Sequence, residues 1–223
     1  MKWNTAIRAA LFDLDGTLVD SLAGIEFAVD HAFSVLELPV RRRELRPLIG
    51  PPIGKIFQQL LPESNEEQLR ALETAFRSCY DSSGWRKTVL HENATRVLEV
   101  LSRARVQLFL VTNKPAFSTH RILEMLNIGQ FFQVVLCRDS RTPGFQSKTE
   151  MLEHLAGTYN FLREECLYIG DTYEDYMAGM ESRIQTAVVI RGEICDDHRY
   201  PGDVICKNLI ELLPDNLKLK EIA

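Results

Sequence analysis

The chain has 223 residues, a hydrophobic fraction of 45% and a formal net charge of −5, which allows a substantial core in one domain or in one domain with an insert. The negative charge disfavours nucleic acid and anionic membrane surfaces as partners, and no apolar run approaches the ~20 residues of a spanning helix. Five scattered cysteines without a CxxC pair are typical of reduced thiols. Because no leader precedes the first predicted strand, we expect a cytoplasmic protein.

The first predicted strand is the apolar run Ala9–Phe12, which leads directly into Asp13 and Asp15 before Gly16 ends it. Carboxylates at the end of a buried strand need a partner or a metal, because burial of an unpaired charge is costly. We therefore expect a divalent cation and a phosphate group at the carboxyl edge of this strand. Open parallel α/β sheets bind their ligands at that edge.

The next segment, residues 20–85, contains no convincing strand. Apolar residues recur at helical spacing from Leu22 to Leu36, and the capping box at residues 64–67 opens a further helix. We expect this segment to form an inserted helical cap, with residues 1–19 and 86–223 as a discontinuous α/β core. The two crossings between core and cap would lie near residues 19–20 and 83–84.

Beyond the insert, apolar runs alternate with helical patterns, and these runs predict strands at residues 106–111, 132–137, 166–170 and 186–190. Asn93 is expected to cap one intervening helix, and Pro115 to lie in the first turn of another. This alternation predicts an α/β fold with a doubly wound, Rossmann-like parallel sheet and helices on both faces. After Arg191, apolar residues fit a final helix: Val204, Ile205, Leu209, Leu212 and Leu213.

Four segments resemble, in order, the motifs of the haloacid dehalogenase-like superfamily, most of whose members are phosphatases. They are Asp-Leu-Asp-Gly-Thr at 13–17, Leu-Val-Thr-Asn-Lys-Pro at 110–115, Lys148, and Gly-Asp-Thr-Tyr-Glu-Asp at 170–175. The helical insert resembles that of the superfamily's helical-cap subclass. The sequence Ile-Gly-Pro-Pro-Ile-Gly-Lys at 49–55 is similar to the cap loop of phosphoglycolate phosphatase-like members.

The resemblance implies that Asp13 is a nucleophile that forms an aspartyl-phosphate, which splits hydrolysis into two displacements. Asp15 would protonate the leaving oxygen and later activate water, a role that contributes roughly 10²–10⁴-fold to the rate of an enzyme. Each aspartate could instead have a local role, Asp13 as a cap of the following segment and Asp15 as an Asx-turn residue before Gly16.

The resemblance also implies that Thr112 and Asn113 bind phosphate oxygens and that Lys148 neutralises the phosphate and the carboxylates. The family commonly has a Lys-Pro pair in the third motif, whereas this chain has Ser147-Lys148-Thr149. Lys114 is therefore a competitor for the role of Lys148.

The implied cofactor is Mg²⁺, which prefers about six oxygen ligands in octahedral geometry. By resemblance, its protein ligands would be Asp13, the backbone carbonyl of Asp15, and Asp171. Asp175 lies one helical turn further on and could hold a metal-bound water, or be an acid favoured by a helix N-terminus.

The cap is expected to determine substrate specificity. Lys55 and Arg46 could bind an anionic leaving group, although solvated charges beside a structural turn are an equal alternative.

We therefore predict magnesium-dependent hydrolysis of a small phosphorylated metabolite by a phosphoglycolate phosphatase-like monomer or homodimer. Phosphoglucomutase-like transfer, pyrophosphatase and nucleotidase activities are alternatives within the family. A noncatalytic phosphate-binding regulatory module is the alternative from a different class, and the intact set of Asp13, Asp15, Lys148 and Asp171 argues against it.

Overall fold

The computed structural model describes residues 7–39, 45–191, 200–201 and 205–213. Its main feature is a six-stranded sheet in the order β5–β4–β1–β6–β7–β8, in which every pairing is parallel. The strands are β1 (Ala9–Phe12), β4 (Gln107–Thr112), β5 (Val134–Cys137), β6 (Cys166–Gly170), β7 (Gln185–Val189) and β8 (Ile205–Cys206). Their apolar sequences are typical of strands that are buried on both faces.

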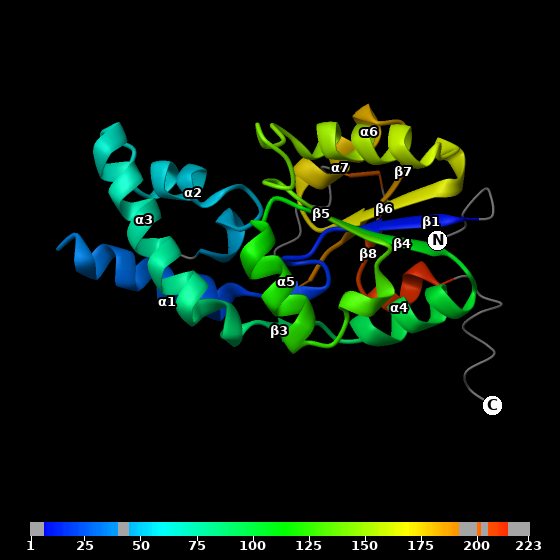
Figure 1. Ribbon diagram of the computed structural model, residues 1–223, viewed down its shortest axis with the longest axis horizontal. Coiled ribbons are helices and arrows are strands. Elements are labelled where there is room, and N and C mark those ends of the chain that lie inside the picture. The colour runs from blue at the N-terminus through cyan, green and yellow to red at the C-terminus, as the bar shows by residue number, and fades with distance from the viewer. Residues whose placement is uncertain (1–6, 40–44, 192–199, 202–204, 214–223) are drawn as a thin grey trace.

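Helices cover both faces of this sheet (Figure 1). On one face lie α4 (Ala94–Arg103), α5 (Ala116–Met125) and the short helix η6 (Leu209–Leu212); on the other lie α6 (Lys148–Tyr159) and α7 (Tyr173–Glu181). Alternate residues of β1 serve the two cores, since Ala10 and Phe12 pack with the first group and Ala9 and Leu11 with the second. The predicted doubly wound α/β fold is confirmed.

A helical unit stands beside the carboxyl edge of the sheet (Figure 1). Its elements are α1 (Leu22–Val35), η1 (Arg46–Leu48), α2 (Ile53–Leu60) and α3 (Glu66–Ser82). Aromatic side chains fill its interior: Phe57 contacts Phe76 edge-on, and Phe76 stacks on Tyr80 with ring centroids 5.3 Å apart. These contacts give the inserted segment an apolar core of its own.

A short antiparallel ribbon joins the helical unit to the sheet. Its strands are β2 (Val19–Asp20) and β3 (Val89–Leu90), and η2 (Gly84–Lys87) precedes β3. Gly84 packs against the first turn of α1, where a Cβ built on Gly24 would lie 2.3 Å from the Gly84 carbonyl oxygen. The two segments that connect the helical unit to the core therefore lie side by side. The domain boundaries at residues 20 and 85 stay a prediction.

Several local predictions need correction. The predicted final helix is wrong: Ile205 pairs with β7 in a two-residue strand, and residues 209–212 form one short 3₁₀ helix, while Val204 lies outside the described residues. Asn93 precedes α4, but its φ is +63° and its amide donates to Asn208 instead of capping. Asn65, not Ser64, caps α3 by accepting the Gln68 N–H.

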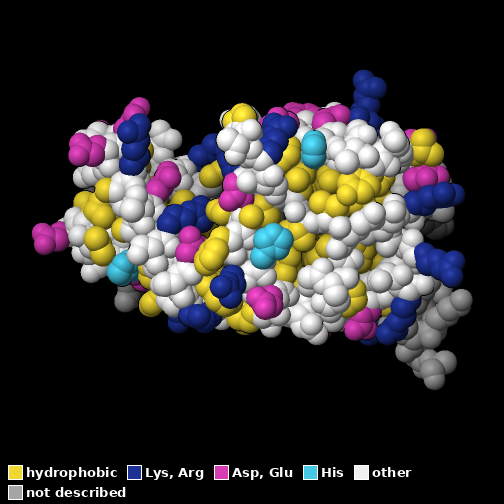
Figure 2. Space-filling view, viewed as in Figure 1, with side chains coloured by type: hydrophobic (Ala, Val, Ile, Leu, Met, Phe, Trp, Pro, Cys, Tyr) yellow, Lys and Arg dark blue, Asp and Glu magenta, His cyan; other side chains and the backbone are white. Residues whose placement is uncertain are grey.

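The remaining short helices are η3 (Gly129–Phe131) and η4 (Arg163–Glu165). Among the helices of the described residues, none combines the length and apolar character needed to cross a membrane. On the face drawn in Figure 2, basic and acidic side chains are interspersed. This face offers no single-sign surface of the kind that attracts a polyanion.

Candidate active site

Three neighbouring strands deliver the central site residues to one edge of the sheet. Asp13 directly follows β1, Thr112 ends β4, and Asp171 directly follows β6. Because β1 lies between β4 and β6, these residues meet at the carboxyl ends of parallel strands. The Asp13 N–H donates to the Ile169 carbonyl at 2.8 Å, which continues the β1–β6 ladder up to the site.

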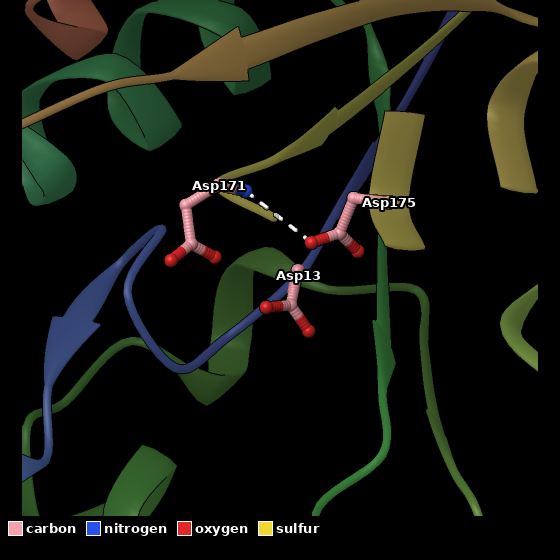
Figure 3. A group of neighbouring side chains, drawn as sticks. All are labelled: Asp13, Asp171 and Asp175. Atoms are coloured by element: carbon pink, nitrogen blue, oxygen red, sulfur yellow. Dashed lines mark hydrogen bonds between the residues drawn. The ribbon is translucent and has the colours of Figure 1, made fainter. Parts of the chain in front are cut away.

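Three carboxylates form the acidic part of the site (Figure 3); Asp13 and Asp175 are buried and Asp171 is half-buried. Asp13, Asp171 and Asp175 each offer an oxygen within 4.8 Å of those of the other two. Burial raises the pKa of Asp13 to about 7 against the opposing effect of Lys148. Burial, together with the charges of Asp175 and Asp13, raises the pKa of Asp171 well above its ordinary value. This excess of buried negative charge, carried by oxygen donors, fits a hard divalent cation.

Lys148 is the counter-charge of this cluster. It begins α6, whose N-terminus is capped by Ser147 through the Glu150 N–H. Its ammonium lies 2.9 Å from Asp13 Oδ1 and 2.6 Å from Asp175 Oδ1, and only 1% of its side chain is exposed. The geometry therefore puts Lys148, the predicted third-motif lysine, on the carboxylate of Asp13.

Lys114, the competing lysine, has a different partner. Its Nζ lies 3.0 and 3.1 Å from the two carboxylate oxygens of Asp15. Both lysines therefore belong to the site, one bound to each aspartate of the first motif. The positions of the two lysines along the sequence did not show which of them fills the third-motif role.

Asp175 uses both of its oxygens for hydrogen bonds. Oδ1 accepts from Tyr168 at 2.5 Å as well as from Lys148, and Oδ2 accepts from the Thr172 hydroxyl at 2.6 Å and the Thr172 N–H at 3.0 Å. With Thr172 it forms the capping box of α7. These bonds make Asp175 an anchor for Lys148, and its expected role at a metal stays a prediction.

The loop after β1 is held by Thr17, to which the sequence analysis gave no role of its own, and by Arg191, which it did not identify. The Thr17 hydroxyl donates to Asp171 Oδ1 at 3.2 Å, and Arg191 donates to the backbone carbonyls of Gly16 and Thr17. Gly16 has a φ of +82°, and a Cβ there would lie 1.9 Å from Asp171 Oδ2. The sequence gives only a weak indication of a role for Arg191, which is the first charged residue after the apolar run 186–190.

The predicted phosphate-binding residues differ in their surroundings. The buried Thr112 hydroxyl accepts the Lys114 N–H at 3.2 Å, which fixes the turn after β4. The Asn113 amide instead donates to the Gly50 carbonyl at 3.3 Å and to Glu174 at 3.4 Å. Asn113 thus ties the cap loop to the start of α7, and its role toward substrate stays a prediction.

The cap loop reaches the site at Gly50, not at Lys55. Gly50 has a φ of +128°, and a Cβ on it would lie 2.8 Å from Thr172 Cγ2. Lys55 is exposed on α2, and Arg46 forms an ion pair with Asp20 at 3.3 Å. Binding of a substrate by Lys55 therefore stays a prediction.

Comparisons with known proteins agree with this geometry. The family model of haloacid dehalogenase-like hydrolases matches residues 10–189, and the chain belongs to this family. It is 32% identical over 185 residues to the tyrosine-protein kinase PtkA of Mycobacterium tuberculosis, covering 82% of this chain but only 62% of that relative. It is also 32% identical over 200 residues to the phosphoglycolate phosphatase of Salmonella typhimurium, covering 77% of each.

Solved structures give the same fold. A haloacid dehalogenase-like hydrolase from Streptococcus pneumoniae, SP0104, superposes with a TM-score of 0.81 at 28% identity, covering 92% of this chain and 96% of that chain. The structure of PtkA from M. tuberculosis has a TM-score of 0.76 at 27% identity and covers 93% of this chain and 96% of its own. The family resemblance deduced from the motifs is confirmed.

Proposed function

We propose that this protein hydrolyses a small phosphate monoester through an aspartyl-phosphate on Asp13, with Mg²⁺ as cofactor. The observation that carries the proposal is the pairing of each first-motif aspartate with its own buried lysine, Asp13 with Lys148 and Asp15 with Lys114. This arrangement gives two neighbouring carboxylates different surroundings, as a nucleophile and an acid–base group require. The phosphatases among the relatives of the chain support the same reaction class.

In the first displacement, a carboxylate oxygen of Asp13 attacks phosphorus and the bond from phosphorus to the leaving oxygen breaks. Asp15 gives its proton to that oxygen. Lys148, 2.9 Å from Asp13, favours the ionised form that the attack needs. In the second displacement, water attacks phosphorus, Asp15 takes the proton of that water, and the Asp13 carboxylate is released with inorganic phosphate.

Two groups of the chain can stabilise the negative charge on the phosphoryl oxygens during both steps. The Lys148 ammonium is next to the nucleophile, and the Thr112 hydroxyl lies at the end of the neighbouring strand. Both are buried, with 1% exposure, so their interaction with a bound phosphate would be little screened by water.

The cluster fits a magnesium ion through its oxygen donors and its surplus of negative charge. Asp13 and Asp171 would hold the ion, together with the Asp15 backbone carbonyl that the family resemblance implies. When bound, Mg²⁺ would offset the repulsion between the substrate phosphate and the carboxylates. Thr17 and Arg191 hold the loop and the Asp171 carboxylate in place for this purpose.

A second candidate is transfer of the phosphoryl group to a hydroxyl acceptor. The relative named tyrosine-protein kinase PtkA matches 82% of this chain, although the chain spans only 62% of that relative. In this alternative the acceptor oxygen replaces water in the second displacement, and Asp15 takes the proton of the acceptor. The chemistry at Asp13 would be unchanged.

A screen of phosphorylated metabolites, with release of inorganic phosphate as readout, tests the proposal. We expect release that requires Mg²⁺ and is abolished by Asp13→Asn, because an amide cannot form the acyl-phosphate. The variant should keep the circular dichroism spectrum of the parent protein. Near-normal release by Asp13→Asn would overturn the nucleophile assignment. Labelling of a tyrosine-containing peptide from ATP without phosphate release would favour the second candidate.

A further inference from the structure

Lys114 lies between the catalytic edge of the core and the helical unit. On one side its ammonium is 3.0 Å from an Asp15 carboxylate oxygen, and on the other it is 4.7 Å from the centre of the Tyr80 ring. Tyr80 belongs to α3, and only 1% of it is exposed. One buried cation thus connects the acid–base aspartate with an aromatic side chain from a separate part of the fold.

The Tyr80 ring is held from several directions. Phe76 stacks on it with an interplanar angle of 10°, and a Cβ built on Gly84 would lie 2.9 Å from its Cδ2 atom. A Cβ on Gly24 would lie 3.5 Å from its Cε2 atom. Since Gly24 and Gly84 belong to the two chain crossings, the ring is fixed where the helical unit meets the core.

The Lys114 ammonium lies over the face of the Tyr80 ring, in the geometry of a cation–π contact. Burial opposes the charge on Lys114, but the Asp15 carboxylate and the hydroxyl group of Tyr80 more than offset this effect and hold the pKa of Lys114 above its ordinary value. An aromatic ring attracts an ammonium over its face, and the attraction is stronger where water is excluded. Lys114 is therefore a fixed cation whose position depends on Tyr80.

We infer that Lys114 and Tyr80 are positioning residues for proton transfer by Asp15: the ring fixes the ammonium, and the ammonium fixes both oxygens of the carboxylate. This inference rests on the proposed function, in which Asp15 protonates the leaving oxygen. A carboxylate that is free to rotate spends less time at the leaving oxygen, so the proton-transfer step slows. The attack by Asp13 keeps its own lysine and is affected less.

The leaving group of the substrate separates these two effects. An alkyl phosphate needs a proton on its leaving oxygen, whereas the anion of p-nitrophenol leaves without one. Loss of Asp15 positioning should therefore lower kcat/KM for an alkyl phosphate and change kcat/KM for p-nitrophenyl phosphate little. This constant covers the steps up to departure of the leaving group, so it leaves out hydrolysis of the aspartyl-phosphate, in which Asp15 also acts. A general loss of folded protein lowers both rates equally.

The test compares kcat/KM on an alkyl phosphate and on p-nitrophenyl phosphate for Lys114→Met, Tyr80→Leu and their double variant. Tyr80→Leu should lower the alkyl-to-aryl ratio of kcat/KM by about two- to thirtyfold, the range expected for loss of one cation–π contact. Lys114→Met should lower the ratio at least as far. The double variant should match Lys114→Met, because Tyr80 acts through the lysine.

Two controls separate positioning from packing. Tyr80→Phe removes the hydroxyl, which has no hydrogen-bond partner within the described residues, and keeps the ring face, so it should keep the parent ratio. A loss as large as that of Tyr80→Leu would overturn the role of the ring. Phe57→Leu removes another buried ring of the helical unit, so it should lower the melting temperature and leave the ratio unchanged. All rates are measured below the melting temperature of each variant.

Equal losses on both substrates, or additive effects in the double variant, would overturn the inference. A parent protein that releases phosphate from neither substrate, nor from any metabolite in the wider screen, would instead refute the proposed function. The two failures are therefore distinguishable.

Discussion

Replacement of Lys148 by methionine tests whether the carboxylate cluster of Asp13, Asp171 and Asp175 depends on a single counter-charge. Methionine keeps the unbranched shape of lysine and is a good helix former, so the start of α6 should be preserved. At 2.9 Å and an effective dielectric constant of about 20, one such ion pair is worth about 6 kcal/mol before desolvation. Removal of one partner of a buried pair typically costs about 3–5 kcal/mol.

We therefore expect Lys148→Met to lower the free energy of unfolding by about 3–5 kcal/mol at pH 8 in the presence of chelator. For a chain of this size that corresponds to a fall in melting temperature of about 6–20 °C. Mg²⁺ should restore part of the loss, because it replaces the missing positive charge. Urea denaturation gives the free energy, and a thermal melt gives the shift.

The effect should depend on pH. Without Lys148, Asp13 and Asp175 lose the cation that lowers their pKa values in the folded protein. A carboxyl group in an unfolded chain has a pKa of about 3.9. If its pKa is higher in the folded protein, the group destabilises the fold increasingly as the pH rises between these two pKa values. The deficit of the variant should therefore be smaller at pH 5.5 than at pH 8.

A matched control is Arg70→Met, which breaks the exposed Arg70–Glu66 pair at 2.9 Å on α3. This change should alter the unfolding free energy by no more than about 0.5 kcal/mol, since exposed pairs contribute little. The reasoning is refuted if Lys148→Met stays within about 1 kcal/mol of the parent protein at pH 8, with no dependence on pH.

Three further predictions concern turnover. Asp15→Asn should lower kcat on an alkyl phosphate by roughly 10²–10⁴-fold and leave Mg²⁺ affinity unchanged. Weaker Mg²⁺ binding with a normal rate at saturating Mg²⁺ would instead make the Asp15 side chain a metal ligand. Ca²⁺ should inhibit Mg²⁺-supported phosphate release because its larger, looser coordination shell disturbs in-line attack; full activity in excess chelator would exclude a metal role. Lys55→Ala should raise KM for an anionic substrate but not for an aryl phosphate, and an equal loss on both would assign Lys55 to the general machinery or the fold.

The sheet could be predicted from sequence because a strand buried on both faces is a continuous apolar run. Residues 166–170 were predicted with the bounds that β6 has, and the runs around β4, β5 and β7 differ from the strands by one or two residues. The C-terminal elements were mispredicted because they are too short to show such a pattern. A two-residue strand and a single 3₁₀ turn are too short to show a period, and an apolar pattern of that length fits a helix equally well.

Within the site, the sequence was sufficient to predict the residues that end or directly follow a strand. Asp13, Thr112 and Asp171 adjoin or end neighbouring parallel strands, so the chain direction alone brings them to one edge. Sequence spacing left open whether Lys148 or Lys114 fills the third-motif role, because the two lysines lie on different segments whose reach depends on packing. The structure pairs Lys148 with Asp13 and Lys114 with Asp15.

Only the tertiary structure decided the contacts between distant segments. Arg191 holds the carbonyl of Gly16 from 175 residues away, and Tyr80 reaches Lys114 from the helical unit. Such contacts leave little or no local pattern, since an arginine or tyrosine that makes a distant contact looks in sequence like any other. Local composition determines which segments are buried and where their polar ends fall, whereas the packing of those segments determines which charges meet.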